Sequence, residues 1–205
     1  MLILRLISIL LLLSISPSIA QAVGRESSDK QFVIVRETTE LTNKVLPQVM
    51  IGVGLLPPAI KQKLQAFGIK VVITPSHFRF NGETGHSEYE SNYKQVLICE
   101  RDADGSPSNV ARMPITTLHE LGHAYDHMLG YPSRKDEFQT IYLSEAARVP
   151  AEDRRRLDYF LQPGRPGSRE TFASLFACRF FHEGDRRLDM LKKNFPQTFA
   201  LVQRY

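Results

Sequence analysis

Residues 116–127, TTLHELGHAYDH, constrain the fold of this chain more than any other stretch, because they place three histidines and two acids in twelve positions. The pattern predicts a helix over residues 114–129. His119 and His123 are four residues apart, so on a helix they lie one turn apart on the same face. Glu120 is rotated by about 100° from His119. This H-E-x-x-H spacing lets two imidazoles share one metal ion.

A catalytic zinc ion is held by three protein ligands and leaves its fourth position open to water or substrate. His119 and His123 would be two of the three ligands. Zinc lowers the pKa of its bound water toward about 7 and polarises a carbonyl, so Glu120 can take the water proton and direct attack on a peptide bond. Chance alone produces the pattern in about one chain in a hundred of this length. A surface helix with incidental histidines also fits Gly122 poorly, since glycine inside a helix costs about 1 kcal/mol relative to alanine. We therefore predict one zinc ion per chain on His119 and His123, Glu120 as general base, and a tightly packed helix face at Gly122.

A third zinc ligand has to come from elsewhere in the chain. His127 lies eight residues from His119, a rise of about 12 Å along a helix, whereas both zinc bonds must be near 2 Å. The metzincin pattern is excluded as well, because Asp126 and Leu129 stand where it requires glycine and histidine.

Three carboxylates compete for that position. We expect Asp126 to hold a ligand imidazole in its tautomer or to bridge to a neighbouring segment. Glu145 follows His123 by 22 residues, close to the thermolysin-like spacing, but lacks the aspartate expected four residues later. Glu170 is the stronger candidate, because small residues on its side of a predicted helix allow close approach to the histidine helix. These small residues are Ala173, Ser174 and Ala177.

The N-terminus has the pattern of a secretory signal peptide over residues 1–22. Arg5 precedes a mainly apolar run at 6–15, and small residues at 20–22 match an A-x-A cleavage site. The run is shorter than the roughly 20 apolar residues that cross a membrane. We expect a secreted protein, extracellular or periplasmic, whose domain spans 23–205 and keeps no stable membrane anchor.

Composition supports one compact domain, since 42% of the 205 residues are hydrophobic and 23% are charged. The net charge of +4 comes from scattered basic residues, so we expect no nucleic-acid partner. An oxidising compartment permits a Cys99–Cys178 disulfide. Two buried thiols that never meet are the alternative, and the sequence leaves both open.

Periodicity predicts an α+β fold, with a small N-terminal sheet and helices followed by an all-helical C-terminal half. The strands are expected within 31–36, 69–74 and 93–99, and Pro75 to Asn92 as a long surface loop. The helices are expected in the later part of 31–50 and at 55–68, 114–129, 137–148, 151–161, 168–182, 185–194 and 196–205.

Three stretches, HELGHAYD, RETFASLFA and KKNFPQTFALVQRY, together resemble the lethal-factor-like zinc metalloproteases, a family that includes the catalytic domain of anthrax lethal factor and the secreted Pro-Pro endopeptidases. The resemblance covers 114–205 and reaches weakly back to LLPPAIKQKLQAFGIKVVIT. It implies a zincin-like fold and a zinc metalloendopeptidase of the two-His, one-Glu gluzincin type. It also implies that Glu170, the glutamate of the E-x-F-A segment, is the third ligand.

The chain departs from that family at two positions. Pro163 stands where members usually carry a tyrosine thought to stabilise the tetrahedral intermediate, and Ser174 stands where many carry an acid. Tyr159 is the nearest upstream phenol, and we expect it either to point toward the cleft as the oxyanion donor or to cap the core with its hydroxyl in water. His77 and His86, or water, are the other possible donors.

The sequence therefore predicts a secreted, monomeric zinc endopeptidase that acts on a protein or peptide substrate. Two alternatives remain at this level. One is an exported zinc-binding interaction module without turnover, and the other is a zinc amidase acting on cell-wall peptides.

Overall fold

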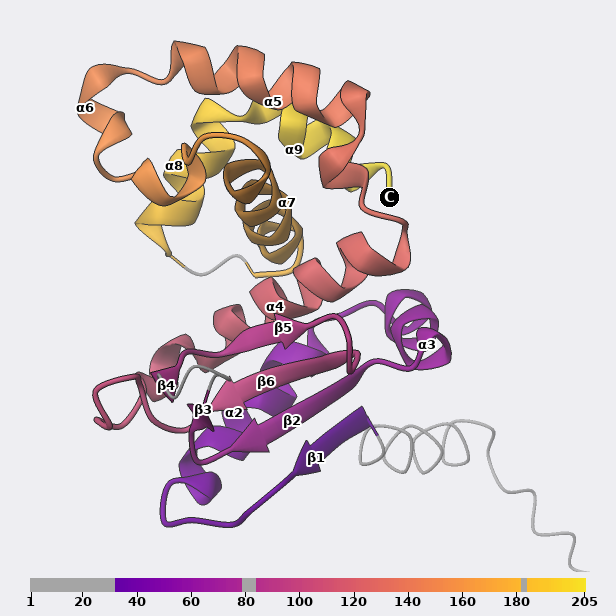
Figure 1. The fold of residues 1–205 in the computed structure, drawn as a ribbon, viewed down its shortest axis with the longest axis vertical. Helices are drawn as coiled ribbons and strands as arrows, with labels where there is room; N and C mark the ends of the chain where they lie inside the picture. The colour runs from indigo at the N-terminus through magenta and orange to yellow at the C-terminus, as the bar shows by residue number, and fades with distance from the viewer. Residues whose placement is uncertain (1–31, 79–83, 182–183) are drawn as a thin grey trace, which may run out of the picture. The chain divides into compact units, whose positions relative to one another are not determined.

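A computed structural model describes residues 32–78, 84–181 and 184–205 (Figure 1). The predicted signal peptide, residues 1–22, lies outside the described residues, as does His182, to which we assign no catalytic role. Among the helices of the described part, none combines the length and the apolarity that crossing a membrane requires.

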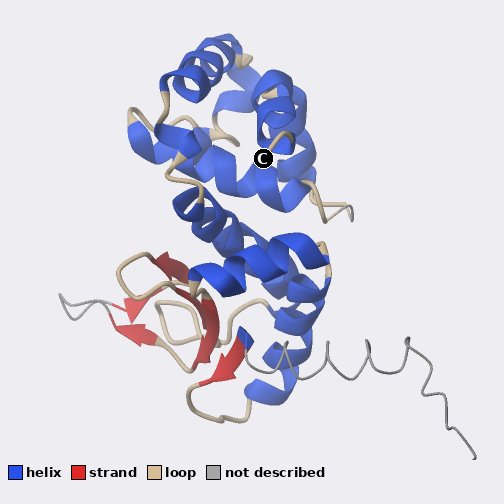
Figure 2. Ribbon diagram, turned by 90° about the vertical axis from the view of Figure 1, so that its right-hand side faces the viewer, coloured by secondary structure: helices blue, strands red, loops and turns tan. Residues whose placement is uncertain are grey.

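Strands occur in the first half of the described chain and helices dominate the second half, which is the predicted α+β layout (Figure 2). The strands are β1 (Val33–Val35), β2 (Lys70–Thr74), β3 (His77–Phe78), β4 (Thr84–Gly85), β5 (Glu88–Glu90) and β6 (Gln95–Cys99). The helices are α2 (Thr42–Gly54), α3 (Pro58–Phe67), α4 (Met113–Met128), α5 (Asp136–Arg148), α6 (Ala151–Arg154), α7 (Arg165–Cys178), α8 (Arg186–Asn194) and α9 (Pro196–Gln203). Three 3-10 turns, η1 (Val110–Arg112), η2 (Pro132–Arg134) and η3 (Asp158–Phe160), complete the described elements.

The main sheet has the strand order β1-β2-β6-β5, in which β1, β2 and β6 are parallel and β5 is antiparallel to β6. In the register of the parallel strands, Val71 pairs with Val33 on one side and with Val96 on the other. These valines belong to the hydrophobic core together with Val49 of α2 and Leu118 of α4. The sheet, α2 and α4 therefore share one core.

Helix α4 is the central element, because it contacts α2, β5 and β6 as well as α7 (Figure 1). Two glycines permit these close approaches. A β-carbon on Gly52 of α2 would lie 2.7 Å from the carbonyl oxygen of Pro114, and one on Gly122 of α4 would lie 2.8 Å from the Cα of Ala173. The expected tight packing at Gly122 is thus confirmed.

The segment from Pro75 to Asn92 is more regular than the predicted surface loop. Strand β5 pairs with β6 along its whole length, so that Tyr89 lies opposite Val96. Its sequence is Glu-Tyr-Glu, and all three residues are half-buried. Such a short polar strand has no hydrophobic alternation, and its position at the sheet edge is fixed by pairing with β6.

The prediction of one helix over 151–161 was wrong. Helix α6 stops at Arg154, and the chain continues through η3. Leu157 and Phe160 are both buried, and their spacing of three residues suits a 3-10 turn. The Tyr142 hydroxyl donates to the carbonyl oxygen of Phe160 at 2.6 Å, so a contact from another helix fixes this turn.

Helix α7 begins at Arg165, three residues before the predicted start of this helix at Ser168. Gly164 adopts a φ of 74° and turns the chain into the helix. Pro166 lies in the first turn, where a helix does not need a backbone N–H. Ser168 is buried inside the helix, and its hydroxyl donates to the Arg165 carbonyl oxygen at 3.0 Å.

The possible disulfide between Cys99 and Cys178 does not form. Cys99 ends β6 and Cys178 ends α7, which stops before the predicted residue 182, and both side chains are buried without a bond between them. The alternative of two buried thiols was the correct one.

Candidate metal centre

Helices α4 and α7 bring His119, His123 and Glu170 together. One ligand atom from each of these side chains lies within 4.8 Å of the others. The Nε2 atom of His119 lies 3.1 Å from Oε2 of Glu170, and the Nε2 atom of His123 lies 3.3 Å from the same oxygen. The two imidazole rings meet edge to face, with centroids 4.8 Å apart. The four-residue spacing in α4 and the close approach at Gly122 produce this convergence.

The three side chains influence one another's protonation. Burial alone would raise the pKa of Glu170, but hydrogen bonds from His119 and His123 outweigh it and hold that pKa well below its usual range. Burial lowers the pKa of His123 to about 4 despite the Glu170 bond. For His119, burial acts in the same direction, but the Glu170 bond and the charges of Glu120 and Glu170 outweigh it, so its pKa is raised.

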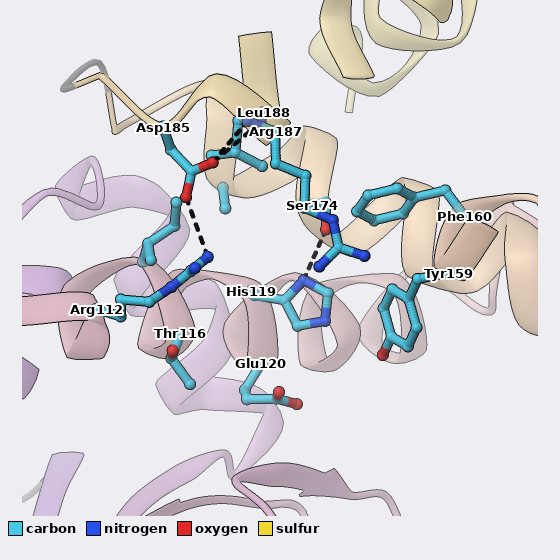
Figure 3. Close-up of a pocket in the computed structure, with 12 residues that line it drawn as sticks. Arg112, Thr116, His119, Glu120, Tyr159, Phe160, Ser174, Asp185, Arg187 and Leu188 are labelled. Atoms are coloured by element: carbon cyan, nitrogen blue, oxygen red, sulfur yellow. Dashed lines mark hydrogen bonds and ion pairs between the residues drawn. The ribbon is translucent and has the colours of Figure 1, made fainter. Parts of the chain in front are cut away.

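Ser174, one helical turn after Glu170 in α7, orients the His119 ring. Its Oγ lies 2.9 Å from Nδ1 of His119 (Figure 3). This bond leaves Nε2 of His119 directed at Glu170. The sequence identified Ser174 as a small residue on the Glu170 side of the helix and as a departure from a family acid, but did not predict its bond to His119. Nδ1 of His123 is buried and has no hydrogen-bond partner among the described residues.

Glu120 is buried beside the two histidines, with 7% of its surface exposed. Burial raises the pKa of its carboxyl to about 7. The negative charges of Glu170 and Glu88 add to this shift, whereas the charge of His119 and a hydrogen bond from the Tyr89 backbone N–H oppose it. Figure 3 shows the carboxylate of Glu120 projecting from α4 near the His119 ring. A carboxyl with a pKa near neutrality can both accept and return a proton.

Tyr159 reaches the same site from η3. Its hydroxyl donates to Oε2 of Glu170 at 2.7 Å, while 41% of the residue remains exposed. Burial and the Glu170 bond raise the pKa of the phenol, so the hydroxyl keeps its proton; Arg187 acts weakly in the opposite direction. The structure therefore places the Tyr159 hydroxyl at the candidate centre and not over the core in water.

Two residues that the sequence did not single out hold the turn that carries Tyr159. One is Tyr142 of α5, whose hydroxyl bonds the Phe160 carbonyl oxygen. The other is Gly167 of α7, where a β-carbon would lie 2.8 Å from that same oxygen. Because α7 also carries Glu170, this packing fixes the tyrosine relative to the carboxylate. No local pattern signals it, since the three elements meet only in the fold.

Glu145 is not near the histidines. Its buried carboxylate accepts hydrogen bonds from the backbone N–H groups of Gln197 and Thr198, at 2.8 and 3.0 Å, and from the Thr198 hydroxyl at 2.6 Å. It therefore caps the N-terminus of α9. Asp126 bridges to the neighbouring segment, one of its two predicted roles, because it accepts from the N–H of Ser133 at 2.9 Å and from its hydroxyl at 2.6 Å.

His127 and His86 are not among the possible metal ligands of the centre. His127 bonds the Tyr89 hydroxyl through Nδ1 at 2.8 Å and stacks on Tyr131. His86 is exposed and lines a different cavity. His77 belongs to β3, and its side chain is outside the described part of the structure.

A cavity of about 230 Å³ opens beside the centre, lined by His119, Glu120 and Tyr159. Figure 3 shows these three side chains around the space, with Arg187 approaching from α8. The site thus combines three possible metal ligands, a buried carboxyl, a phenol and room for part of a ligand.

No protein-family model and no curated protein sequence matches this chain. Among solved structures, the Pro-Pro endopeptidase PPEP-2 from Paenibacillus alvei is similar, with a TM-score of 0.55 and 20% sequence identity. The match covers 86% of this chain and 98% of that one. The described part of the chain therefore has a fold similar to that of PPEP-2.

Proposed function

We propose that this protein is an exported zinc-dependent endopeptidase of the two-His, one-Glu type. The observation that carries the proposal is the convergence of His119, His123 and Glu170 within 4.8 Å beside the buried Glu120. The similarity in fold to a Pro-Pro endopeptidase supports hydrolysis of a peptide bond. Export rests on the predicted signal peptide alone.

The donor set fits zinc. Two imidazole nitrogens and one carboxylate are the usual protein ligands of a catalytic zinc ion, and they must be deprotonated to bind it. The pKa shifts of His123 and Glu170 favour the deprotonated form, whereas the raised pKa of His119 opposes it, so zinc would compete with a proton for this imidazole. Ser174 holds the His119 ring through Nδ1, so Nε2 is the atom that would bind the metal. When bound, zinc would supply the Lewis acidity that activates water and polarises the substrate carbonyl.

The protein's own residues would handle the protons and the developing charge. Glu120 would accept a proton from the attacking water on its carboxylate and pass it to the leaving amine. Tyr159 would donate its hydroxyl hydrogen to the oxygen that becomes negative in the transition state. This requires the Tyr159 hydroxyl to exchange its hydrogen bond from Glu170 to the substrate. The raised phenol pKa supports this role, since only a protonated hydroxyl can donate.

The test is a peptide-library digest that compares the wild-type protein with Glu120→Ala, with bound zinc measured in both. We expect the variant to keep one zinc per chain and to lose cleavage, because Glu120 is not a ligand. Equal cleavage by both proteins would remove Glu120 from the mechanism. Absence of cleavage by either, with one zinc bound, would favour an interaction module without turnover.

A further inference from the structure

The cavity beside the metal centre has apolar walls and a charged margin. Ile115, Phe160, Ala177 and Leu188 contribute the apolar surface. If the protein cleaves peptides, a substrate side chain next to the cleaved bond would enter this space, because the cavity also borders His119 and Glu120. The charges at its margin would then select the side chain.

Two arginines line this cavity, and their environments differ. Arg112 is neutralised by Asp185, whose Oδ2 lies 3.1 Å from the guanidinium. The Oδ1 atom of Asp185 accepts the backbone N–H groups of Arg187 and Leu188 at the start of α8. Both oxygens of Asp185 are therefore occupied. The guanidinium of Arg187 has no carboxylate partner among the described residues.

Aromatic rings hold the Arg187 guanidinium at the cavity. Its central carbon lies 4.8 Å from the ring centroid of Phe160 and 5.4 Å from that of Tyr159. Figure 3 shows the guanidinium reaching from α8 into the space between His119 and these rings. A stacked guanidinium keeps its planar N–H donors available for a carboxylate, which it can bind with two parallel hydrogen bonds.

Further arginines lie next to Arg187, around a second cavity. Arg187 also lines a second cavity of about 510 Å³, together with Arg156, Asp158, Arg186 and Met190. The lining of this second cavity therefore contains three arginines and one aspartate. The two cavities adjoin at Arg187, which lines both. Such a surface attracts an acidic segment of a peptide chain.

We propose that Arg187 is a specificity-determining residue, which selects peptide substrates with an aspartate or glutamate side chain next to the cleaved bond. This proposal rests on the proposed peptidase function. The substrate carboxylate would pair with the Arg187 guanidinium at the cavity margin, and further acidic residues would follow the arginine-lined second cavity. The competing explanation is that Arg187 only positions Tyr159 by stacking on its ring.

The first test is a digest of a random peptide library by wild type, Arg187→Gln and Arg187→Glu, with the cleaved bonds identified by mass spectrometry. Arg134→Gln is the matched control, since Arg134 also stacks on a tyrosine, Tyr131, at 3.9 Å, and does not line either cavity. We expect wild type and the control to cleave peptides with Asp or Glu at one position next to the cleaved bond about tenfold more efficiently than the other peptides. A factor of this size is within what a charge-assisted hydrogen bond contributes. Arg187→Gln should lose the preference, and Arg187→Glu should prefer Lys or Arg.

Equal slowing of all peptides by the Arg187 variants, without a change in preference, would overturn the proposal in favour of the stacking role. Wild type without any acidic preference would also overturn it.

The second test does not depend on cleavage and separates the two proposals. Glu120→Gln protein is titrated against two fluorescein-labelled decapeptide pools, random except for a central Glu in one and a central Gln in the other. We expect tighter binding of the Glu pool by about tenfold, and equal binding of both pools when Arg187→Gln is added. This result would hold even if wild type cleaved nothing, in which case only the peptidase function would fail. Equal binding of both pools with Arg187 intact would contradict the selection of acidic peptides.

Discussion

Replacing Gly122 with alanine should destabilise the protein, although alanine is the better helix former. The new β-carbon would lie 2.8 Å from the Cα and carbonyl oxygen of Ala173, whereas ordinary contact begins at 3.4 Å. Helices α4 and α7 would have to separate by about 0.6 Å, because backbone atoms cannot rotate away. Overpacking of this kind costs about 1–3 kcal/mol, and the gain in helix propensity is about 1 kcal/mol. We expect a net loss of up to about 2 kcal/mol.

Thermal unfolding measures this loss, which corresponds to a decrease in Tm of up to roughly 8 °C for a chain of this size. Gly54→Ala is the matched control, since Gly54 is helical and a β-carbon there meets nothing within 4 Å. It should leave the protein unchanged or stabilise it by up to about 1 kcal/mol. The separation at Gly122 also exceeds the roughly 0.2 Å tolerance of metal–ligand distances, so zinc affinity should fall in that variant only. Equal stabilisation by both substitutions would refute the argument from close packing.

Four further substitutions test the roles of individual side chains. Tyr159→Phe should reduce kcat at least about tenfold with KM, zinc content and folding nearly unchanged, and an unaltered kcat would exclude it as the donor. Glu170→Gln should lower zinc affinity by more than about 100-fold in a zinc titration. Glu145→Gln should keep its zinc affinity and lose about 1–3 kcal/mol of stability in urea unfolding. A larger loss of zinc affinity in Glu145→Gln than in Glu170→Gln would support the thermolysin-like spacing. Ser174→Ala should weaken zinc binding by about 10- to 100-fold, since His119 loses its orienting bond; unchanged affinity would contradict that role.

Local patterns were sufficient to predict the element that dominates the site. The H-E-x-x-H spacing defines a helix face by itself, so α4 and the pairing of His119 with His123 follow from helical periodicity. The small residues around Glu170 pointed to a helix that packs closely on α4, and the contact of Gly122 with Ala173 confirms that packing. These predictions succeeded because each depended on residues within one or two turns.

The features that the sequence did not reveal depend on contacts between distant segments. Strand β5 is too short and polar to show alternation, and it exists because it pairs with β6. The turn that presents Tyr159 is held by Tyr142 and Gly167 from two other helices. The position of Arg187 at the cavity likewise depends on how α8 packs beside η3. Periodicity within a segment carries no information about such contacts.

The most direct test of the central claim is anomalous diffraction at the zinc absorption edge from crystals of the zinc-loaded protein. We predict one peak per chain, at about 2.0–2.2 Å from the Nε2 atoms of His119 and His123 and from a carboxylate oxygen of Glu170. A peak bound by other residues, or no peak between these three side chains at saturating zinc, would contradict the proposed metal centre.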